Sequence, residues 1–173
     1  STIVAVAIIA NLCLSRFILE LGSTELFGGN SLLVGLIPYL IPVAFAPMIV
    51  MITVGPRMAA LSALMTSVFH ATMQNAGIEA LAISLGAALA GAYFCRDMRL
   101  RGSALKAGAM AGLTGALLAL GVAFASGSGG ISSIHHALAS LLMGVFTGGL
   151  VLAAMPLIEN GFKVATDATL FEL

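Results

Sequence analysis

Residues 96–101 read Arg96-Asp97-Met98-Arg99-Leu100-Arg101, and Lys106 follows a few positions later. This short stretch holds four of the seven Lys and Arg residues in the 173-residue chain. The sequence on both sides of it is almost uncharged over more than one membrane thickness. Because Lys and Arg concentrate in the short cytoplasmic loops of membrane proteins, the basic loop predicts which ends of the neighbouring segments lie inside the cell.

The composition is typical of a protein embedded in a lipid bilayer. Hydrophobic residues make up 60% of the sequence and charged residues 8%, and the mean hydropathy is +1.13. A soluble domain carries about a quarter charged residues. We therefore predict an all-α, polytopic membrane bundle with room for about six crossings of ~20 residues each. The net charge of zero gives no support for a nucleic-acid partner.

Six hydrophobic segments can be followed along the chain. The second of them contains Pro38, Pro42 and Pro47, each of which removes a backbone donor, so we expect its helix to be broken. We divide the chain into a transmembrane domain, residues 1–158, and an exit segment, residues 159–173. The predicted spans are residues 2–21, 31–54, 57–75, 78–95, 103–125 and 132–157.

The basic loop orients all six spans. With this loop inside, the turn between the second and third spans also lies inside, and so do both chain ends. The acidic loop after the first span and the Gly/Ser-rich loop before the sixth lie outside. The cations that carry or fit this topology are Arg57, Arg96, Arg99, Arg101 and Lys106.

Small residues are abundant in the last two spans. They include Gly108-x-x-x-Gly112 in the fifth and Gly144-x-x-x-Gly148 in the sixth. Such motifs allow helix backbones to approach closely inside a membrane, so we predict tight crossings. A second interpretation is that these faces slide or form a homodimer.

Both cysteines, Cys13 and Cys95, lie in apolar runs, and we expect them to be buried and not to form a disulfide. The chain begins at Ser1 directly on an apolar run, with no initiator Met and no basic region typical of a signal peptide. We expect a domain cut from a longer chain.

Ionisable residues within membrane spans are costly, and they mark candidate functional sites. A rise of ~1.5 Å per residue places His70 about 20 Å from the cytoplasmic end of the third span, in the outer half of the membrane. One hypothesis is an outward-facing polar pocket, lined also by the broken second span, that binds or senses a ligand. In the alternative hypothesis, Arg16 pairs with Glu20 at the membrane interface, and the histidines are interfacial residues or hydrogen-bonded core residues. The candidates are Arg16, Glu20, His70, Gln74, Glu79, His135 and His136.

No catalytic or metal-binding constellation is evident. Asp97 and Asp167 are expected inside, whereas the histidines are expected outside, so no triad can form. The side chains of His135 and His136 diverge by ~100° on a helix, and no other residue accompanies them at metal-ligand spacing. We assign no catalytic residue, cofactor or metal to this segment.

Two stretches carry a family resemblance. One is Tyr39-Leu-Ile-Pro-Val-Ala-Phe-Ala-Pro-Met48, followed by Gly55-Pro-Arg-Met-Ala59; the other is Met155-Pro-Leu-Ile-Glu159, followed by Phe162 and by Thr166-Asp-Ala-Thr-Leu-Phe-Glu-Leu173. Both resemble the membrane domain of the seven-transmembrane receptors with an intracellular HD hydrolase, the family of the cyclic di-AMP phosphodiesterases. Phe171 stands where that family usually has Leu.

The resemblance implies the rest of the architecture. In that family an extracellular domain precedes the membrane helices, and a metal-dependent cytoplasmic HD phosphohydrolase follows them. This chain would be the transducing middle of a multi-pass protein in the bacterial cytoplasmic membrane, with one more helix before Ser1. The hydrolase and its metal ions would lie outside this segment. The residues expected to couple the bundle to it are Pro156, Glu159, Thr166, Asp167 and Glu172.

Two other classes of function were weighed. A substrate-capture subunit of a vitamin uptake transporter also has about six helices and many small residues, and it would bind a small molecule. An intramembrane enzyme is disfavoured because no reactive pair lies on one side. His-Asp motifs in the codons after Leu173 would separate the receptor from the transporter subunit.

The topology makes a direct prediction about Arg99. A cysteine placed beside Arg99 should stay unlabelled when intact cells are treated with a membrane-impermeant maleimide, because a cluster of arginines is too costly to move across lipid. The same cysteine should react after the cells are permeabilised. Labelling in intact cells would contradict the six-span map.

Overall fold

The computed structural model describes residues 2–23, 36–75, 77–96, 102–127 and 130–162. Within these ranges every regular element is a helix and no strand occurs, which confirms the predicted all-α class. Six α-helices and one 3-10 helix follow one another. They are α1 (Thr2–Ser23), η1 (Ile37–Leu40), α3 (Phe45–Thr53), α4 (Pro56–Met73), α5 (Ile78–Phe94), α6 (Gly102–Ala125) and α7 (Ile131–Phe162).

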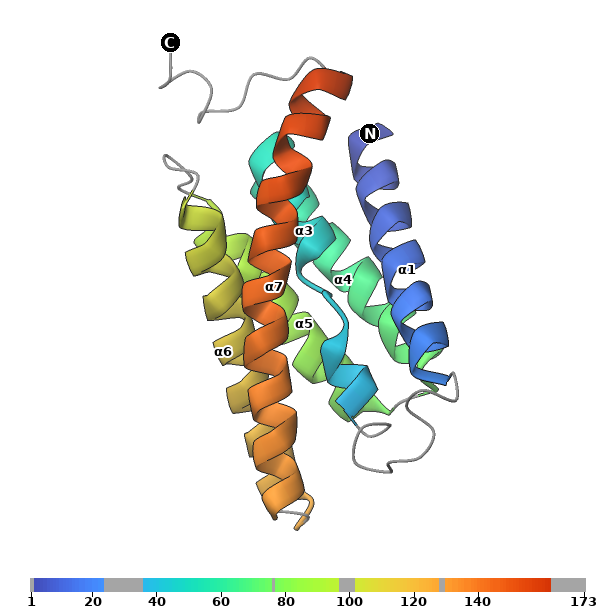
Figure 1. Ribbon diagram of the computed structural model, residues 1–173, viewed down its shortest axis with the longest axis vertical. Helices are drawn as coiled ribbons and strands as arrows, with labels where there is room; N and C mark the ends of the chain where they lie inside the picture. The colour runs from blue at the N-terminus through green and yellow to red at the C-terminus, as the bar shows by residue number, and fades with distance from the viewer. Residues whose placement is uncertain (1, 24–35, 76, 97–101, 128–129, 163–173) are drawn as a thin grey trace.

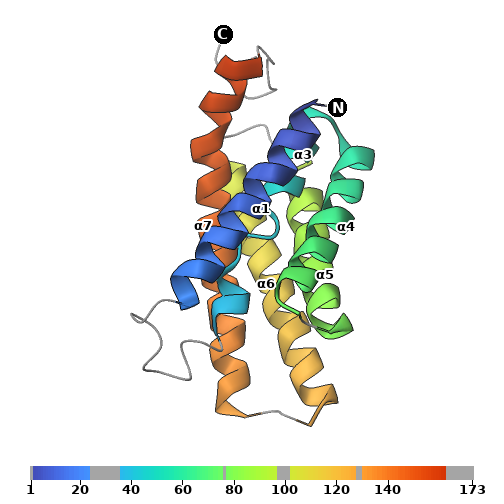
Figure 2. The ribbon, with the colours of Figure 1, turned by 90° about the vertical axis from the view of Figure 1, so that its right-hand side faces the viewer.

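The helices run up and down between two ends of the bundle (Figures 1 and 2). At one end α1, α4 and α6 begin and α5 and α7 finish. That end therefore carries Arg57 at the start of α4, Arg96 just after α5 and Lys106 in the second turn of α6. These cations gather at one end, as the predicted topology requires. The start of α1 and the end of α7 lie at this same end.

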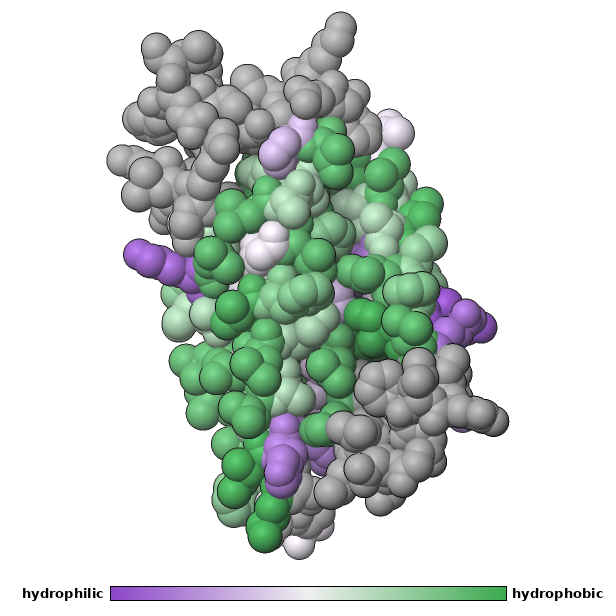
Figure 3. Space-filling view, in the orientation of Figure 1, coloured by the Kyte–Doolittle hydropathy of each residue, from purple (hydrophilic) through white to green (hydrophobic). Residues whose placement is uncertain are grey.

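On the face that Figure 3 shows, most of the described residues are hydrophobic, with a few hydrophilic side chains among them. Among the described residues, three helical stretches are long and apolar enough to cross a membrane: Thr2–Leu21, Ser103–Ala125 and Ser133–Ile158. Ile78–Phe94 is apolar but shorter. Large side chains such as Phe17, Leu117 and Phe146 are exposed on these helices, as expected for a surface that contacts lipid. The full set of six crossings stays a prediction.

The second segment is broken, as its prolines predict. Its described part consists of η1, a non-helical connection over residues 41–44, and the nine-residue helix α3. Pro42 lies in the connection and Pro47 in the first turn of α3, where a missing backbone donor costs least. Both prolines are buried, so the break lies inside the protein and not against lipid.

A side chain from α1 stabilises this break. Asn11 is 2% exposed, and its Nδ2 donates a hydrogen bond of 2.9 Å to the backbone carbonyl of Pro42. Ser15, also buried, donates to the Asn11 carbonyl at 2.8 Å. Non-helical backbone at membrane depth persists only where protein or water satisfies its polar groups. The first helix supplies that partner here.

The turn into α4 depends on Gly55. Its φ is +119°, a conformation that side-chain-bearing residues rarely adopt. Pro56 then occupies the first turn of α4, as predicted, where its fixed φ favours helix initiation. This pair of residues turns the chain sharply between two apolar helices.

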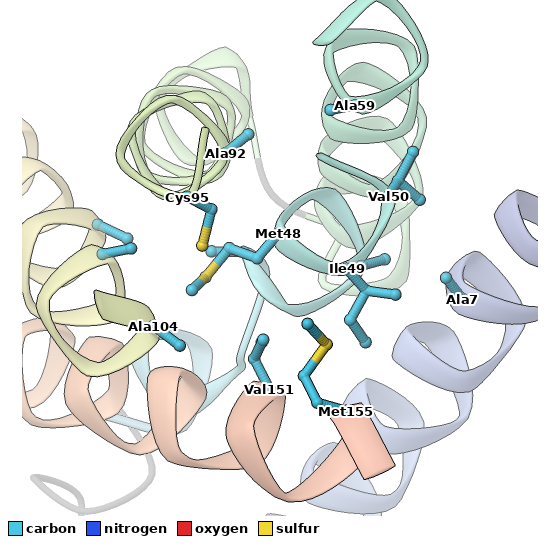
Figure 4. Close-up of a cluster of buried hydrophobic side chains, with 14 residues drawn as sticks. Ala7, Met48, Ile49, Val50, Ala59, Ala92, Cys95, Ala104, Val151 and Met155 are labelled. Atoms are coloured by element: carbon cyan, nitrogen blue, oxygen red, sulfur yellow. The ribbon is translucent and has the colours of Figure 1, made fainter. Parts of the chain in front are cut away.

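One part of the core lies in the half of the bundle that holds the chain ends. It consists of small and flexible side chains. Met48 and Ile49 of α3 lie among helices α1, α5, α6 and α7, with Met48 beside Cys95 and Ile49 beside Met155 (Figure 4). The buried members of this cluster are Ala7, Ala44, Ala46, Met48, Ile49, Val50, Ala59, Ala92, Cys95, Ala104, Ala107, Ala111, Val151 and Met155. The short helix α3 is thus the centre of the packing.

Helices α6 and α7 cross with their backbones almost touching, which confirms the tight packing predicted from the two glycine motifs. A Cβ added at Gly108 would lie 2.7 Å from the Cα of Gly148. A Cβ added at Gly144 would meet the backbone of Gly112 and of Gly108. Only glycine permits this approach, and such contact replaces the hydrophobic driving force that lipid removes.

Helix α7 is longer than the sixth predicted span. It has 32 residues and runs through Pro156 to Phe162, five residues past the expected end of the span at Leu157. A proline within a membrane helix is tolerated when neighbouring groups satisfy the freed carbonyl. Glu159 therefore belongs to the helix, whereas Thr166, Asp167 and Glu172 lie outside the described residues.

The cysteines differ from each other. Cys95 is buried at the end of α5, as expected, but Cys13 is exposed, so the expectation that it is buried is wrong. Cys13 lies on the outward face of α1, two residues from buried Asn11. Both thiols are free.

The glycine crossing yields a stability prediction. Gly144→Ala should lower the free energy of unfolding by about 1–3 kcal/mol, because the new methyl group meets backbone that has no side chain to move aside. SDS titration of the protein in mixed micelles would measure this change in the free energy of unfolding. Gly149→Ala is the matched control, since nothing lies within 4 Å of its added Cβ. Equal stability of the two variants would contradict the close crossing.

The Asn11 bond yields a second prediction. Asn11→Leu should lower the free energy of unfolding by about 1–2 kcal/mol, because the Pro42 carbonyl loses its donor inside the bundle. Cys13→Leu, on the exposed face of the same helix, should leave it unchanged. A thermal-unfolding series in detergent compares the two. A stable Asn11→Leu variant would mean that the break needs no partner from α1.

A candidate ligand pocket at the end of the bundle away from the chain ends

A cavity of about 440 Å³ lies between the helices towards the end where α5 and α7 begin. Five parts of the chain line it: η1 with the connection that follows, the end of α4, the start of α5, and facing stretches of α6 and α7. A volume of this size is typical of small-molecule sites, which span about 300–1,000 Å³. The wall combines apolar side chains with a few polar ones.

Four of the seven predicted site residues line the cavity. They are His70 and Gln74 at the end of α4, Glu79 in the first turn of α5, and His136 near the start of α7. The broken second segment also lines it, through Tyr39, Ile41, Val43 and Ala44. The structure therefore brings together residues from three predicted spans that were assigned to one leaflet.

His70 and Gln74 form a polar pair on one face of α4. His70 is 5% exposed, and its Nε2 lies 2.6 Å from the Gln74 side-chain nitrogen. The two residues are one turn apart, so their side chains stack along the helix. This contact holds the imidazole in a fixed orientation at the cavity wall.

Tyr39 and His136 form an aromatic wall. Their rings are stacked with centroids 4.5 Å apart and planes inclined by 13°. Tyr39 belongs to η1 and His136 to α7, so the contact joins segments 97 positions apart in the sequence. His136 was predicted from the sequence, whereas Tyr39 was not; the signal for Tyr39 was its position in the proline-rich segment.

Glu79 supplies the charge at the rim. It is exposed, and it lies in the first turn of α5, where the positive end of the helix dipole favours a carboxylate. Among the described residues that line the cavity, Glu79 is the single acid, and no Lys or Arg accompanies it. The wall is therefore electronegative at its mouth.

The deep end of the cavity reaches the glycine crossing. Ala44, Ala111, Gly112, Gly144 and Thr147 line it there. Thr147 donates to the carbonyl of Met143 in its own helix at 2.7 Å, so its hydroxyl is already engaged. Small residues at this depth leave space that larger side chains would fill.

Three predicted site residues lie elsewhere. Arg16 Nε and Glu20 Oε1 are 3.4 Å apart with the two side chains 65% and 69% exposed, so they form a surface ion pair away from the cavity. His135 is exposed, and its Nδ1 lies 2.9 Å from the carbonyl of Ile131. Arg16, Glu20 and His135 therefore fit the alternative hypothesis, in which the arginine pairs with the glutamate and the histidine is interfacial.

The remaining predicted residues are on the surface or outside the described ranges. Arg57, Arg96 and Lys106 are exposed at the end opposite the cavity, and Pro156 is exposed on α7. Arg99 and Arg101 lie outside the described residues. Within the part of the chain that the structure describes, no group of three His, Cys, Asp or Glu side chains could hold a metal ion.

Comparison with protein families gives one match. Residues 1–166 match the family described as the 7TM receptor with intracellular HD hydrolase. The chain belongs to this family. The match covers nearly all of its length, and it agrees with the resemblance carried by the proline-rich segment and by the stretch around Pro156. No curated protein and no solved structure matches the chain.

Membership defines the coarse role of the segment. It is the seven-transmembrane sensor domain of receptors that carry an intracellular HD hydrolase, and it is a membrane protein. The cavity is then a chamber within a receptor bundle. Its polar residues lie towards the end of the bundle where α7 begins, away from the end where α7 finishes.

Proposed function

We propose that this segment is the sensor and transducer of a membrane-bound cyclic di-AMP phosphodiesterase. A ligand or partner acting at the extracytoplasmic end changes the packing of the bundle, and α7 passes the change to the HD hydrolase. The hydrolysis itself, with its metal ions, belongs to the hydrolase domain. The segment contributes regulation and no reacting group.

The observation that carries this proposal is the continuity of α7. One helix of 32 residues, about 48 Å long, begins at the cavity and ends at the exit. His136, Ser140 and Met143 of α7 line the cavity, whereas Val151 and Met155 pack in the core near the other end. A rigid helix with both sets of contacts transmits rotation or sliding over its whole length.

A second contact supports the same route. Ala44 lines the cavity and also belongs to the buried core, where Met48 of α3 packs near Val151 of α7. A change in the cavity that moves the connection before α3 therefore moves the core as well. The break in the second segment makes this possible, since α3 is not tied to η1 by helical hydrogen bonds.

The placement in the cell follows the same proposal. The segment crosses the bacterial cytoplasmic membrane six times, with its basic end, carrying Arg57, Arg96 and Lys106, inside. An extracellular domain and one further helix precede it in the parent protein, and the hydrolase follows on the inner side. The cavity then faces outward, where an extracytoplasmic ligand reaches it.

The test is a change in the phase of α7. In the full-length protein, one residue inserted after Gly161 turns Phe162, the last residue of α7, by about 100° relative to the bundle. We expect this variant to lose the response of the phosphodiesterase to the extracytoplasmic stimulus, while the hydrolase still cleaves cyclic di-AMP. Activity in membranes, measured with and without the extracellular domain, reports the response.

A seven-residue insertion at the same place is the matched control. It lengthens the connection but restores the helical phase to within about 20°, so the response should largely return. Pro156→Ala should change the response without abolishing cleavage. If every variant follows the extracytoplasmic stimulus as the parent does, α7 is a passive linker and the proposal fails.

A further inference from the structure

We infer that the cavity is a binding site for a small organic cation with a planar, largely apolar ring system. The inference rests on the proposed function, because it names the class of ligand that the sensor would bind. It goes further by assigning the site to Glu79, Tyr39 and His136. None of these residues takes part in the hydrolase chemistry.

The charge of the cavity wall determines which sign of ligand charge is favoured. Glu79 is the single acid among the described lining residues, and no Lys or Arg lines the cavity with it. Arg16, the basic residue at this end of the bundle, is paired with Glu20 outside the cavity. An anion would meet an uncompensated carboxylate at the rim, whereas a cation would neutralise it.

The aromatic wall selects the shape. The stacked rings of Tyr39 and His136 border the cavity and stand parallel to within 13°. A flat ring extends such a stack, and a cation over an aromatic face gains further attraction. Ile83, Ala87 and Met143 add apolar side chains to the lining, and these suit the body of such a ligand.

The size of the space and its depth agree with this class. About 440 Å³ admits an organic molecule and far exceeds the needs of a bare metal ion. No trio of metal-ligating side chains occurs in the described part of the chain, and this also favours an organic ligand. The same cavity continues inwards to Gly112 and Gly144, at the crossing of α6 and α7.

Three probes of one ring size and different charge test the inference. They are 1-methylquinolinium, quinoline and quinoline-4-carboxylate, each dialysed at pH 8 against the full-length protein in detergent micelles. We expect saturable binding of 1-methylquinolinium that is about fivefold tighter than that of quinoline, as one nearby unit charge provides in water-like surroundings. The carboxylate should bind more weakly than quinoline.

The variants separate charge from shape. Glu79→Gln should remove the preference for the cation and leave quinoline binding unchanged. Tyr39→Leu should weaken all three probes. Glu20→Gln is the matched control, because Glu20 is an exposed acid that does not line the cavity. A thermal melt of each variant verifies folding, which the exposed position of Glu79 favours.

The outcomes are distinct. Equal affinity for the three probes, or a cation preference that survives Glu79→Gln, overturns the inference. Phosphodiesterase activity is measured on the same samples. If the cation binds through Glu79 but the helix-phase insertions leave regulation intact, the site stands and the proposed relay fails.

Discussion

The structure depends on one constraint: in lipid, each backbone polar group must find its partner within the protein. A regular helix meets this demand alone, but the second segment cannot, because its prolines remove donors and end its helical ladder. The chain meets the demand by burying the break and by aiming Asn11 at the Pro42 carbonyl. This single bond joins α1 to the connection from which α3 begins, so the outermost helix helps to position the innermost one.

The break also accounts for the cavity. Where η1 ends, the non-helical connection lines the cavity with Ile41, Val43 and Ala44. The glycine crossing holds α6 and α7 together on the other side, and small residues at the deep end leave the space unfilled. Polar residues at helix ends then surround the mouth. The candidate site therefore lies where regular secondary structure is interrupted.

Much of this could be predicted from the sequence, because the strongest patterns are local. Hydrophobic length predicted the helices, prolines predicted the break, and Gly108 and Gly144 predicted the close crossing. The stack of Tyr39 on His136 and the bond from Asn11 to Pro42 could not be predicted, since each joins spans whose relative rotation no local pattern encodes. Cys13 was misplaced for the same reason: an apolar run does not reveal which face of a membrane helix is buried, because lipid and core accept the same residues.

The small residues that allow the close crossing also fit the transmission proposed for the bundle. A contact between two flexible side chains absorbs a displacement by changing rotamers, but a contact between backbones cannot. At the crossing of Gly112 and Gly144 the two backbones meet directly, so α7 can move relative to α6 only by rotating or sliding. Closely packed interiors favour a few discrete arrangements over continuous deformation. In the proposed relay, a bundle built in this way converts a local change at the cavity into a changed position of the whole exit helix.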